Sequence, residues 1–341
     1  MGKGQVTIRD IALKLNISIS TVSRAMRGMA DVNPETKKKV LEMASQLNYE
    51  PNLIAQSLRI NRTNTIGIIV PDVEVHFFSS IVSGIQEVAS EVNYNVLFCQ
   101  SNENYQTELN NLKTLIASRV DGLLISLSRE TEDMEHLLRV QRKNIPLVLF
   151  DRISDDIDTS KVNVSDMDGA FKAVKYLVDT GCRRIAYLAG PKNLAISNKR
   201  MDGYFKALRV CGITPDENLI VHCNSLRDDA GNATDKLLAL KEKPDGIFCV
   251  NDPVALQAMQ VVKQHGFKIP EDISIIGFTD DPVSALVEPA LTTVAQPSHE
   301  MGKCAAKLLI DQIKGYNGAS RTVTLDTKLV LRGTTRALRE T

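Results

Sequence analysis

The 341-residue sequence predicts a small all-α helix-turn-helix domain followed by a larger α/β core, built as two subdomains with parallel sheets. Short, well-capped helical segments fill the first 50 residues. From Thr65 onward, apolar runs rich in β-branched residues alternate with amphipathic helices, which is typical of a parallel sheet with crossover helices. Within this second part, two local patterns recur at one spacing, which indicates two related halves.

Charge is spread unevenly along the chain. The 41 basic and 41 acidic residues cancel overall, but residues 1–62 hold ten Lys and Arg against five Asp and Glu. A basic head on an acidic body favours an anionic partner for the head. No apolar run approaches the roughly 20 residues of a membrane helix, and the first residues lack the apolar stretch of a signal peptide.

The sequence carries no catalytic, metal-binding or disulfide pattern. Its six cysteines form no C-x-x-C pair, so we interpret each as core filler in a reduced, cytoplasmic protein. Walker, dinucleotide-binding and nucleophile-elbow motifs are absent, and the five histidines lack metal-ligand spacing. We therefore expect no catalytic residues, no metal, no cofactor and no membrane partner.

Three short helices account for the basic head. Thr7 caps the first helix, with Asp10 at the capping-box position. Ser18 caps a second helix at Ile19–Met26 after a three-residue turn, and Asn33-Pro34-Glu35 begins a third. Two short helices around such a turn are a helix-turn-helix.

The second helix leaves Ile19, Ser20, Ser23, Arg24 and Arg27 on its outer face, and apart from Ile19 these side chains are small and polar or basic. Side chains of this kind fit the major groove of DNA, where an arginine can pair bidentately with guanine. The alternative is a plain three-helix bundle with a solvated basic face. Turn length, capping and outward chemistry together favour DNA binding.

The core is expected to contain two similar sets of strands. The strands are Ile66–Val70, Val96–Cys99, Gly122–Ile125 and Leu147–Phe150, and then Arg184–Leu188, Leu219–His222, Gly246–Val250 and Ser274–Gly277. Asp121-Gly122 recurs as Asp245-Gly246, and Ile145-Pro146 recurs as Ile269-Pro270, both 124 positions later. We expect the chain to cross between the halves three times, with a helix at Ser298–Lys314 on the first half and Lys328–Leu331 rejoining the second.

Ligands of open α/β sheets bind beyond the carboxyl ends of the strands. The residues that follow the expected strands include aromatic, carboxylate, amide and guanidinium side chains: His76, Phe77, Phe78, Ser126, Asp151, Arg152, Asn251, Asp252, Phe278, Thr279, Asp280 and Asp281. Taken alone, each of these residues is more often a loop residue whose polar group is hydrogen-bonded within the protein than a ligand contact. Jointly, they suit a small polyhydroxylated ligand that stacks on aromatic faces and hydrogen-bonds through its hydroxyls.

Two stretches carry a family resemblance. Val6–Arg24 (VTIRDIALKLNISISTVSR) resembles the headpiece of the LacI/GalR transcription repressors, and Leu47–Leu58 (LNYEPNLIAQSL) resembles their hinge. The resemblance implies that a hinge helix folds on operator DNA and wedges Leu58 into the minor groove. The DNA-binding residues it implies, together with the outer face of the second helix, are Thr7, Ser18, Ile19, Ser20, Thr21, Ser23, Arg24, Asn52, Ala55 and Leu58.

The core is similar to periplasmic sugar-binding proteins. With the strand-end residues, this resemblance implies that the effector is bound by Phe77, Phe78, Ser126, Asp151, Arg200, Asn251, Thr279, Asp280 and Gln296. In Gly277-Phe-Thr-Asp-Asp-Pro282, Thr279 stands where the family often has a sugar-binding Asp, so either Thr279 or Asp280 takes that role. We expect Asp151 and Arg200 to point into one gap between the halves, rather than to form exposed surface salt bridges.

The expected domains are a DNA-binding domain at 1–50, a hinge and linker at 51–63, and two core subdomains. The first core subdomain takes 64–163 and 292–326, and the second takes 164–291 and 327–341. The predicted protein is a homodimeric transcription regulator, a repressor, that reads a pseudo-palindromic operator and is controlled by a sugar-like molecule bound between the subdomains. A purine-type or protein co-effector is the main alternative. A transporter's solute-binding protein is disfavoured by the basic head, and an enzyme by the missing catalytic motifs.

Overall fold

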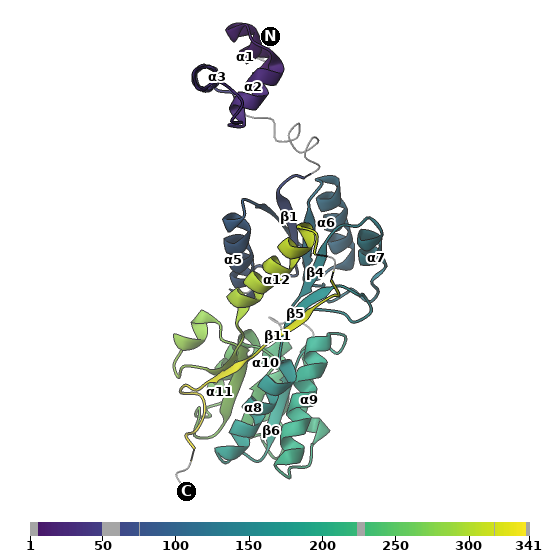
Figure 1. Ribbon diagram of the computed structural model, residues 1–341. Helices are drawn as coiled ribbons and strands as arrows, with labels where there is room; N and C mark the ends of the chain where they lie inside the picture. The colour runs from purple at the N-terminus through teal and green to yellow at the C-terminus, as the bar shows by residue number, and fades with distance from the viewer. Residues whose placement is uncertain (1–5, 50–61, 75, 224–228, 317, 339–341) are drawn as a thin grey trace. The chain divides into compact units, whose positions relative to one another are not determined.

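The computed structural model describes residues 6–49, 62–74, 76–223, 229–316 and 318–338 (Figure 1). The chain divides into two compact units, Met1–Thr63 and Asn64–Thr341. The first unit is the predicted helical headpiece and the second is the predicted α/β core.

The headpiece consists of α1 (Ile8–Leu15), α2 (Ile19–Met26) and α3 (Pro34–Gln46). The expected capping box joins Thr7 and Asp10, and the Ser18 side chain accepts the backbone N–H of Thr21 at 3.0 Å. Asn16 ends α1 in the left-handed conformation (φ 51°) that its short polar side chain tolerates. The buried residues that hold the three helices together are Ile11, Ala12, Val22, Ala25, Val40 and Ala44.

The first lobe of the core is a six-stranded parallel sheet in the order β11-β5-β4-β3-β1-β2. Its strands are β1 (Thr65–Val70), β2 (Asn95–Gln100), β3 (Gly122–Ile125), β4 (Leu147–Phe150), β5 (Ser160–Val164) and β11 (Thr322–Leu325). Its helices are α5 (His76–Glu91), α6 (Tyr105–Ala117), α7 (Glu135–Arg142) and α12 (Ser298–Ile313). Figure 1 shows α5 and α12 side by side, and their apolar residues share one core cluster with one face of the sheet. The opposite face packs in a second cluster with α6 and α7.

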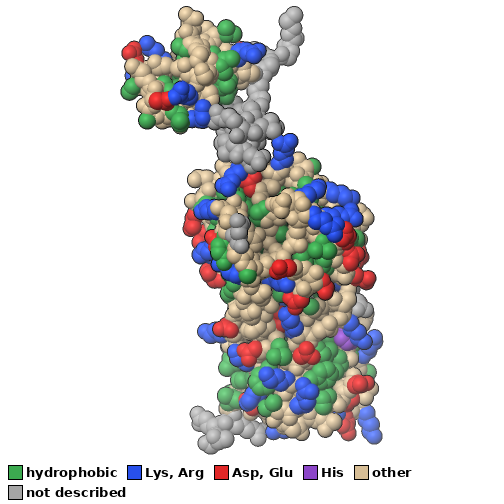
Figure 2. All heavy atoms as spheres, turned by 45° about the vertical axis from the view of Figure 1, so that its right-hand side comes forward, with side chains coloured by type: hydrophobic (Ala, Val, Ile, Leu, Met, Phe, Trp, Pro, Cys, Tyr) green, Lys and Arg blue, Asp and Glu red, His purple; other side chains and the backbone are tan. Residues whose placement is uncertain are grey.

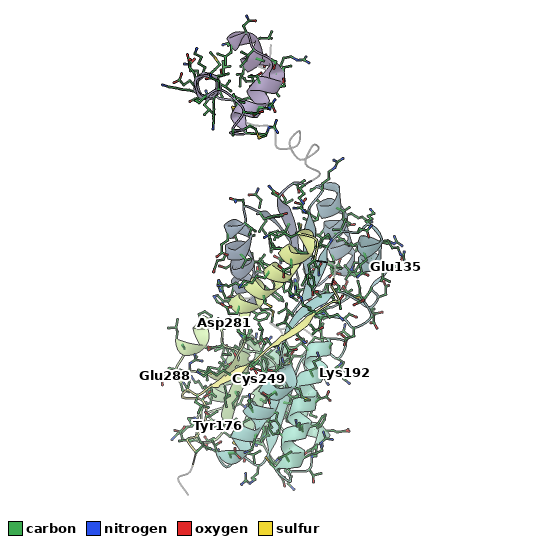
Figure 3. The ribbon with its side chains drawn as sticks, in the orientation of Figure 1. Glu135, Tyr176, Lys192, Cys249, Asp281 and Glu288 are labelled. Atoms are coloured by element: carbon green, nitrogen blue, oxygen red, sulfur yellow. The ribbon has the colours of Figure 1, made fainter. Side chains whose placement is uncertain are left out.

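The second lobe is a six-stranded sheet in the order β12-β10-β9-β8-β6-β7, of which only the β10–β12 pair is antiparallel. Its strands are β6 (Ile185–Ala189), β7 (Ile220–His222), β8 (Gly246–Cys249), β9 (Ser274–Thr279), β10 (Thr292–Ala295) and β12 (Lys328–Val330). Its helices are α8 (Asp166–Asp179), α9 (Ala195–Val210), α10 (Asp229–Leu238) and α11 (Asp252–Gln264), with short 3₁₀ turns η1 (Glu217–Leu219) and η2 (Pro282–Ala285). Cys249, labelled in Figure 3, is fully buried in this lobe, and burial raises the pKa of its thiol.

The 124-residue repeat has a structural cause. The Asp121 carboxylate accepts the backbone N–H of Asn64, just before β1, at 2.9 Å. The Asp245 carboxylate accepts the backbone N–H groups of Arg183 and Arg184, just before β6, at 2.8–3.0 Å. Each Asp therefore joins the start of the third strand in its lobe to the start of the first, and the two halves are equivalent in topology.

The chain crosses between the lobes three times, as expected, but the boundary at residue 292 is wrong. Thr292–Ala295 forms β10, which pairs with β9 and β12 in the second sheet. The crossing comes after Ala295, and α12 then packs on α5 in the first lobe. The first sheet also extends beyond β4 through β5 and β11, two strands that were not expected from the sequence.

Two glycines allow α5 and α12 to touch along their backbones. A Cβ added to Gly84 would overlap the carbonyl of His299, and one added to Gly302 would overlap the carbonyl of Ile81. This close packing holds the amino end of α5, with Phe77 and Phe78, against the helix that follows Gln296. No helix in the described part of the chain is long and apolar enough to cross a membrane.

Candidate nucleic-acid interface and interlobe cavity

The outer face of α2 is polar and solvent-exposed. Ile19 is 42% exposed, Ser20 and Arg24 are exposed, and Val22 and Ala25 on the opposite face are fully buried. Arg24 forms an ion pair with Asp31, which holds its guanidinium at the surface. The helix therefore presents the predicted side chains outward while its apolar face packs in the headpiece core.

The remaining predicted DNA-binding residues divide into two groups. Thr7 and Ser18 are exposed at the amino ends of α1 and α2, and Thr21 and Ser23 are half-buried on α2. Asn52, Ala55 and Leu58, together with most of the predicted hinge at 51–63, lie outside the described residues. The lysines at 37–39 near the start of α3 add basic charge to the same unit.

A cavity of about 60 Å³ lies between the two lobes, at the carboxyl ends of both sheets. Seven of the nine predicted effector residues line it: Phe77, Phe78, Asp151, Arg200, Asn251, Thr279 and Gln296. The two aromatic rings meet edge to face, with centroids 5.2 Å apart. Ligand pockets usually measure about 300–1,000 Å³, so the cavity in this arrangement of the lobes is smaller than a usual ligand site.

Two predicted effector residues do not line this cavity. Ser126 is fully buried, and its hydroxyl has no hydrogen-bond partner. The Asp280 carboxylate accepts a bond from Arg332 Nη2 at 2.7 Å, which draws it toward the strand β12 region. Of the two candidates for the family's missing Asp, the structure therefore places Thr279, and not Asp280, at the cavity wall.

Five cavity residues were not among the predicted effector contacts: Asp72, Glu103, Arg152, Ile196 and Pro253. Arg152 follows β4 and was already among the expected strand-end residues, and Asp72 follows β1, so the same rule could have selected it. The sequence pointed less clearly to Glu103, because this residue lies three positions beyond the end of β2. It lies on a loop and has a positive φ (59°). Nothing in the sequence pattern separates Ile196 and Pro253 from ordinary helix-start residues.

Arg200 is held rigidly inside the second lobe. Its Nε donates to Asp166 Oδ1 at 2.8 Å and its Nη1 donates to the carbonyl of Val250 at 2.6 Å. The guanidinium carbon lies 3.8 Å from the ring centroid of Phe278. The expected fork of two bonds from Arg200 to a ligand is therefore largely taken up within the protein, and the ion pair is buried rather than on the surface.

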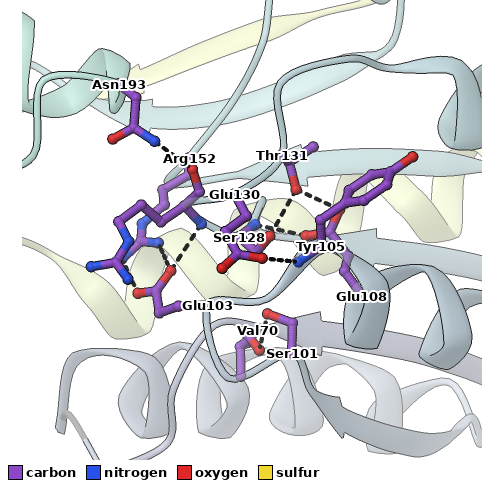
Figure 4. A network of polar contacts seen from close by, with 11 residues as sticks. Val70, Ser101, Glu103, Tyr105, Glu108, Ser128, Glu130, Thr131, Arg152 and Asn193 are labelled. Atoms are coloured by element: carbon purple, nitrogen blue, oxygen red, sulfur yellow. Dashed lines mark hydrogen bonds and ion pairs between the residues drawn. The ribbon is translucent and has the colours of Figure 1, made fainter.

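Arg152 and Glu103 form a second pair on the first lobe (Figure 4). Both terminal nitrogens of Arg152 donate to the Glu103 carboxylate, at 2.5 and 2.8 Å, and Glu103 also accepts the backbone N–H of Arg129. Burial raises the pKa of Glu103, but the bonds and charge of Arg152 outweigh it and hold that pKa below its usual value. The Arg152 Nε is buried without a partner.

Asp151 is the least compensated charge in the cavity. Its backbone has positive φ (58°) and its N–H donates to the carbonyl of Val162 at 2.9 Å, which fixes the loop after β4. Burial raises the pKa of Asp151 to about 6, although Arg152 and Arg200 nearby oppose the shift. Across the cavity, Gln296 Nε2 donates to the Thr279 hydroxyl at 3.2 Å, while Gln296 Oε1 is buried without a partner.

A larger outer pocket of about 410 Å³ adjoins the cavity and shares Arg152 and Ile196 with it. Its first-lobe wall is supported by Glu108, which is fully buried and accepts bonds from Ser128 N at 2.6 Å and from the Thr131 hydroxyl at 3.0 Å (Figure 4). Glu108 also accepts a bond from His136 Nε2 at 2.8 Å. Asn193 Nδ2 donates across to the carbonyl of Arg129 at 2.7 Å and links the lobes. No cluster of His, Cys, Asp or Glu among the described residues could hold a metal ion.

Two apolar surfaces on the core are exposed to solvent. The edge strand β2 exposes Leu97 (40%) and Phe98 (42%), and the η2 turn exposes Val283 (41%) with Leu286 (82%) beside it. An edge strand with large apolar side chains invites pairing with another chain.

Family models match both units of the chain. Residues 7–52 match the model described as bacterial regulatory proteins, lacI family, and residues 174–335 match a periplasmic binding protein-like domain. The chain is 35% identical to the HTH-type transcriptional repressor CytR of Escherichia coli over 97% of both chains. It is 33% identical to the repressor PurR of Vibrio atlanticus and to catabolite control protein A of Priestia megaterium, over 97% of this chain and 99% of each relative.

Solved structures show the same architecture. The lac repressor dimer bound to operator and the anti-inducer ONPF superposes with a TM-score of 0.88 at 28% identity, covering 98% of this chain and 100% of that one. A complex of the transcriptional regulator CelR with cellobiose gives a TM-score of 0.75 at 28% identity, covering 97% and 100%. The relatives are transcriptional regulators and not enzymes.

Proposed function

This chain belongs to the LacI family of bacterial regulatory proteins, and we propose that it is a homodimeric repressor whose operator affinity is set by a small sugar-like molecule bound between its lobes. It is a DNA-binding transcriptional regulator controlled by an effector. The proposal rests on two features that this one chain combines. One is a helix-turn-helix whose second helix exposes a polar recognition face, and the other is a two-lobed core with a polar cavity at its strand ends.

The exposed face of α2 supports recognition of bases in the major groove. Arg24 supplies a guanidinium that can pair bidentately with guanine, and Ser20 and Ile19 are small enough to approach base edges. Thr7 and Ser18 mark the amino ends of two helices, where backbone N–H groups can donate to phosphate oxygens. Asn52, Ala55 and Leu58 are proposed to contact the minor groove by family resemblance alone.

A sugar-like effector is supported by the chemistry of the cavity. Its lining combines two aromatic rings with carboxylate, amide, hydroxyl and guanidinium groups, which suits a ring with apolar faces and several hydroxyls. One structural neighbour was solved in complex with cellobiose, and another with the anti-inducer ONPF. The alternative is a purine-type effector, because Phe77 and Phe78 can stack a flat base and a relative is the repressor PurR.

Homodimer formation is supported by the two exposed apolar surfaces on β2 and η2. The lac repressor neighbour was solved as a dimer bound to operator. Two copies related by a twofold axis read a pseudo-palindromic operator, since the symmetry of the protein matches that of the site. We place this action in the cytoplasm, where bacterial operator DNA lies.

The proposed mechanism is linkage between two sites on the chain. The effector binds one arrangement of the two lobes better than another, and that arrangement changes operator affinity. By thermodynamic necessity, operator DNA changes effector affinity by the same factor.

The test of DNA binding begins with duplexes selected from a random pool on the wild-type protein. We expect a pseudo-palindromic sequence, and Arg24→Ala is expected to weaken its binding by about 1–3 kcal/mol in a gel-shift titration. Arg209→Ala, on α9 of the core, is the matched control and should leave operator affinity unchanged. A selected pool without shared sequence, or an Arg24→Ala protein with wild-type affinity, would contradict the proposal.

The effector is then sought by thermal shift against sugars, sugar derivatives, nucleosides and purines. A ligand at 100 times its Kd adds about 2.7 kcal/mol to the unfolding free energy. A molecule that stabilises the protein must also change operator affinity, and one that stabilises it without that change is not the effector.

A further inference from the structure

Carboxylates outnumber cations around the interlobe cavity. Three carboxylates line it, at Asp72, Glu103 and Asp151, against the two guanidinium groups of Arg152 and Arg200. None of the described lining residues is a lysine or histidine. The cavity therefore carries a formal excess of negative charge.

Both guanidinium groups are already neutralised by partners in their own lobe. Arg152 gives both terminal nitrogens to Glu103. Arg200 is paired with Asp166, which is 2% exposed and lies behind it, and with the carbonyl of Val250. An anionic ligand that displaced either carboxylate from its guanidinium would leave that carboxylate buried without its cation, which is costly.

Several polar groups of the lining have no hydrogen-bond partner in the described contacts, and they include both acceptors and donors, among the donors Arg200 Nη2. Asp151 is 4% exposed, with no cation bonded to its carboxylate in the described contacts. Gln296 is 9% exposed, and its Oε1 is buried without a hydrogen-bond partner. The Arg152 Nε is another donor of the lining that lacks a partner. Hydroxyl groups, which both donate and accept, can satisfy groups of both kinds, whereas a phosphate only accepts.

The lining of the outer pocket also contains more carboxylates than cationic groups. It is lined by Glu132 and Asp156, and Arg152 is its only cationic residue among those described. Figure 2 shows acidic and basic side chains mixed over this part of the core surface, so the excess of carboxylates is a property of the pocket lining. The amino end of α9 adjoins this pocket and attracts anions. The two exposed carboxylates oppose that attraction, so the outer pocket does not offer a phosphate a better site than the cavity.

We propose that the effector is an unphosphorylated molecule, uncharged or carrying an amino group, whose hydroxyl or ammonium donors face Asp151 and Gln296. This inference rests on the proposed function and narrows it, because it excludes sugar phosphates, nucleotides and carboxylic acids as effectors. Asp151 acts as the residue that discriminates against anions. Its carboxylate repels a phosphate and accepts donors from a neutral or cationic ligand.

The experiment compares matched pairs of ligands by isothermal titration calorimetry on the full-length protein. The pairs are ribose with ribose 5-phosphate, glucose with glucose 6-phosphate, adenosine with AMP and cytidine with CMP, and glucosamine is added as the amine-bearing probe. In each pair that binds, we expect the phosphate-free member to bind at least tenfold tighter. A phosphorylated member that binds tighter than its partner would overturn the proposal.

A second experiment uses a variant at Asp151, and it tests the proposal even when no ligand of the panel binds. Asp151→Asn keeps the shape of the side chain and removes its charge, so the thermal midpoint at pH 8 should rise above wild type. Asp158→Asn, at an exposed loop position, is the control and should not change the midpoint. A lower midpoint for Asp151→Asn would mean that the Asp151 charge is compensated by the nearby arginines, and the proposal would fail. Where a neutral ligand binds wild type, its affinity for Asp151→Asn should fall at least tenfold.

This outcome is separable from failure of the proposed function. Operator binding by the wild-type protein tests the repressor assignment without any ligand. A repressor that prefers a phosphorylated effector would contradict only the inference about Asp151.

Discussion

The two lobes share one strand order, β2-β1-β3-β4-β5 against β7-β6-β8-β9-β10, yet they bring different chemistry to the cavity between them. The first lobe supplies both aromatic rings, at the amino end of α5, and the three carboxylates, on the loops after β1, β2 and β4. The second lobe supplies Arg200, the Asn251 amide and the Thr279 hydroxyl. Equal topology therefore fixes where a ligand binds, while the loops decide which ligand it is.

The arginine of each lobe shows the same contrast. Arg200 is held by a carboxylate, a carbonyl and an aromatic ring of its own lobe, and its ion pair is almost fully buried. Arg152 is held by Glu103, whose side chain is 24% exposed, and its Nε has no partner. The second lobe thus presents a rigid wall to the cavity, and the first presents one that can adjust when a ligand enters.

The largest effect on the unfolding free energy is expected when the arginine of either lobe is replaced. Arg200→Ala leaves Asp166 as a buried carboxylate without its cation, which is expected to lower the unfolding free energy by about 3–5 kcal/mol. Arg152→Ala is expected to cost about 1–3 kcal/mol, because water can reach the partly exposed Glu103. Urea unfolding followed by far-UV circular dichroism measures both. Equal losses for the two variants would show that the lobes do not differ in rigidity.

A second prediction concerns Asp151 of the first lobe and how it makes the unfolding free energy depend on pH. Its pKa is about 6 in the folded protein, against 3.8 ordinarily, so the folded state binds more protons than the unfolded state between these values. The unfolding free energy of wild type should therefore fall by about 2 kcal/mol, relative to Asp151→Asn, as the pH rises from 4 to 7. Thermal unfolding of both proteins across this range tests it, and parallel curves would contradict it.

The sequence predicted most of the fold because the signals were local. Capping residues such as Thr7 and Ser18 begin helices where predicted, and the Asp121 and Asp245 repeat marks equivalent strand starts. The strands β5 and β11 were missed because Ser160–Val164 and Thr322–Leu325 are polar at alternate positions, unlike the apolar runs of the central strands.

The sequence predicted the cavity residues that lie near strand ends. It failed for residues whose position depends on a partner far away in the sequence. Seven of the nine expected effector residues line the cavity because the carboxyl ends of parallel strands converge. Asp280 was misplaced because Arg332, 52 residues away in the sequence, draws its carboxylate off the wall. The internal partner of Arg200 could not be foreseen for the same reason, since Asp166 opens a helix that carried no ligand signal.

The smallest expected effect tests whether the first lobe depends on the close contact of α5 and α12. A Cβ at Gly84 would overlap the backbone carbonyl of His299, which no side-chain rotation relieves. Gly84→Ala should therefore lower the unfolding free energy by about 1–3 kcal/mol through overpacking. Gly231→Ala, on α10 of the second lobe, meets only Val261 Cγ2 at 3.8 Å and should be neutral or stabilising by up to about 1 kcal/mol, because alanine favours the helix. Far-UV circular dichroism in urea compares them, and a Gly84→Ala protein as stable as Gly231→Ala would mean that α5 can shift on α12, so that Phe77 and Phe78 are not rigidly placed.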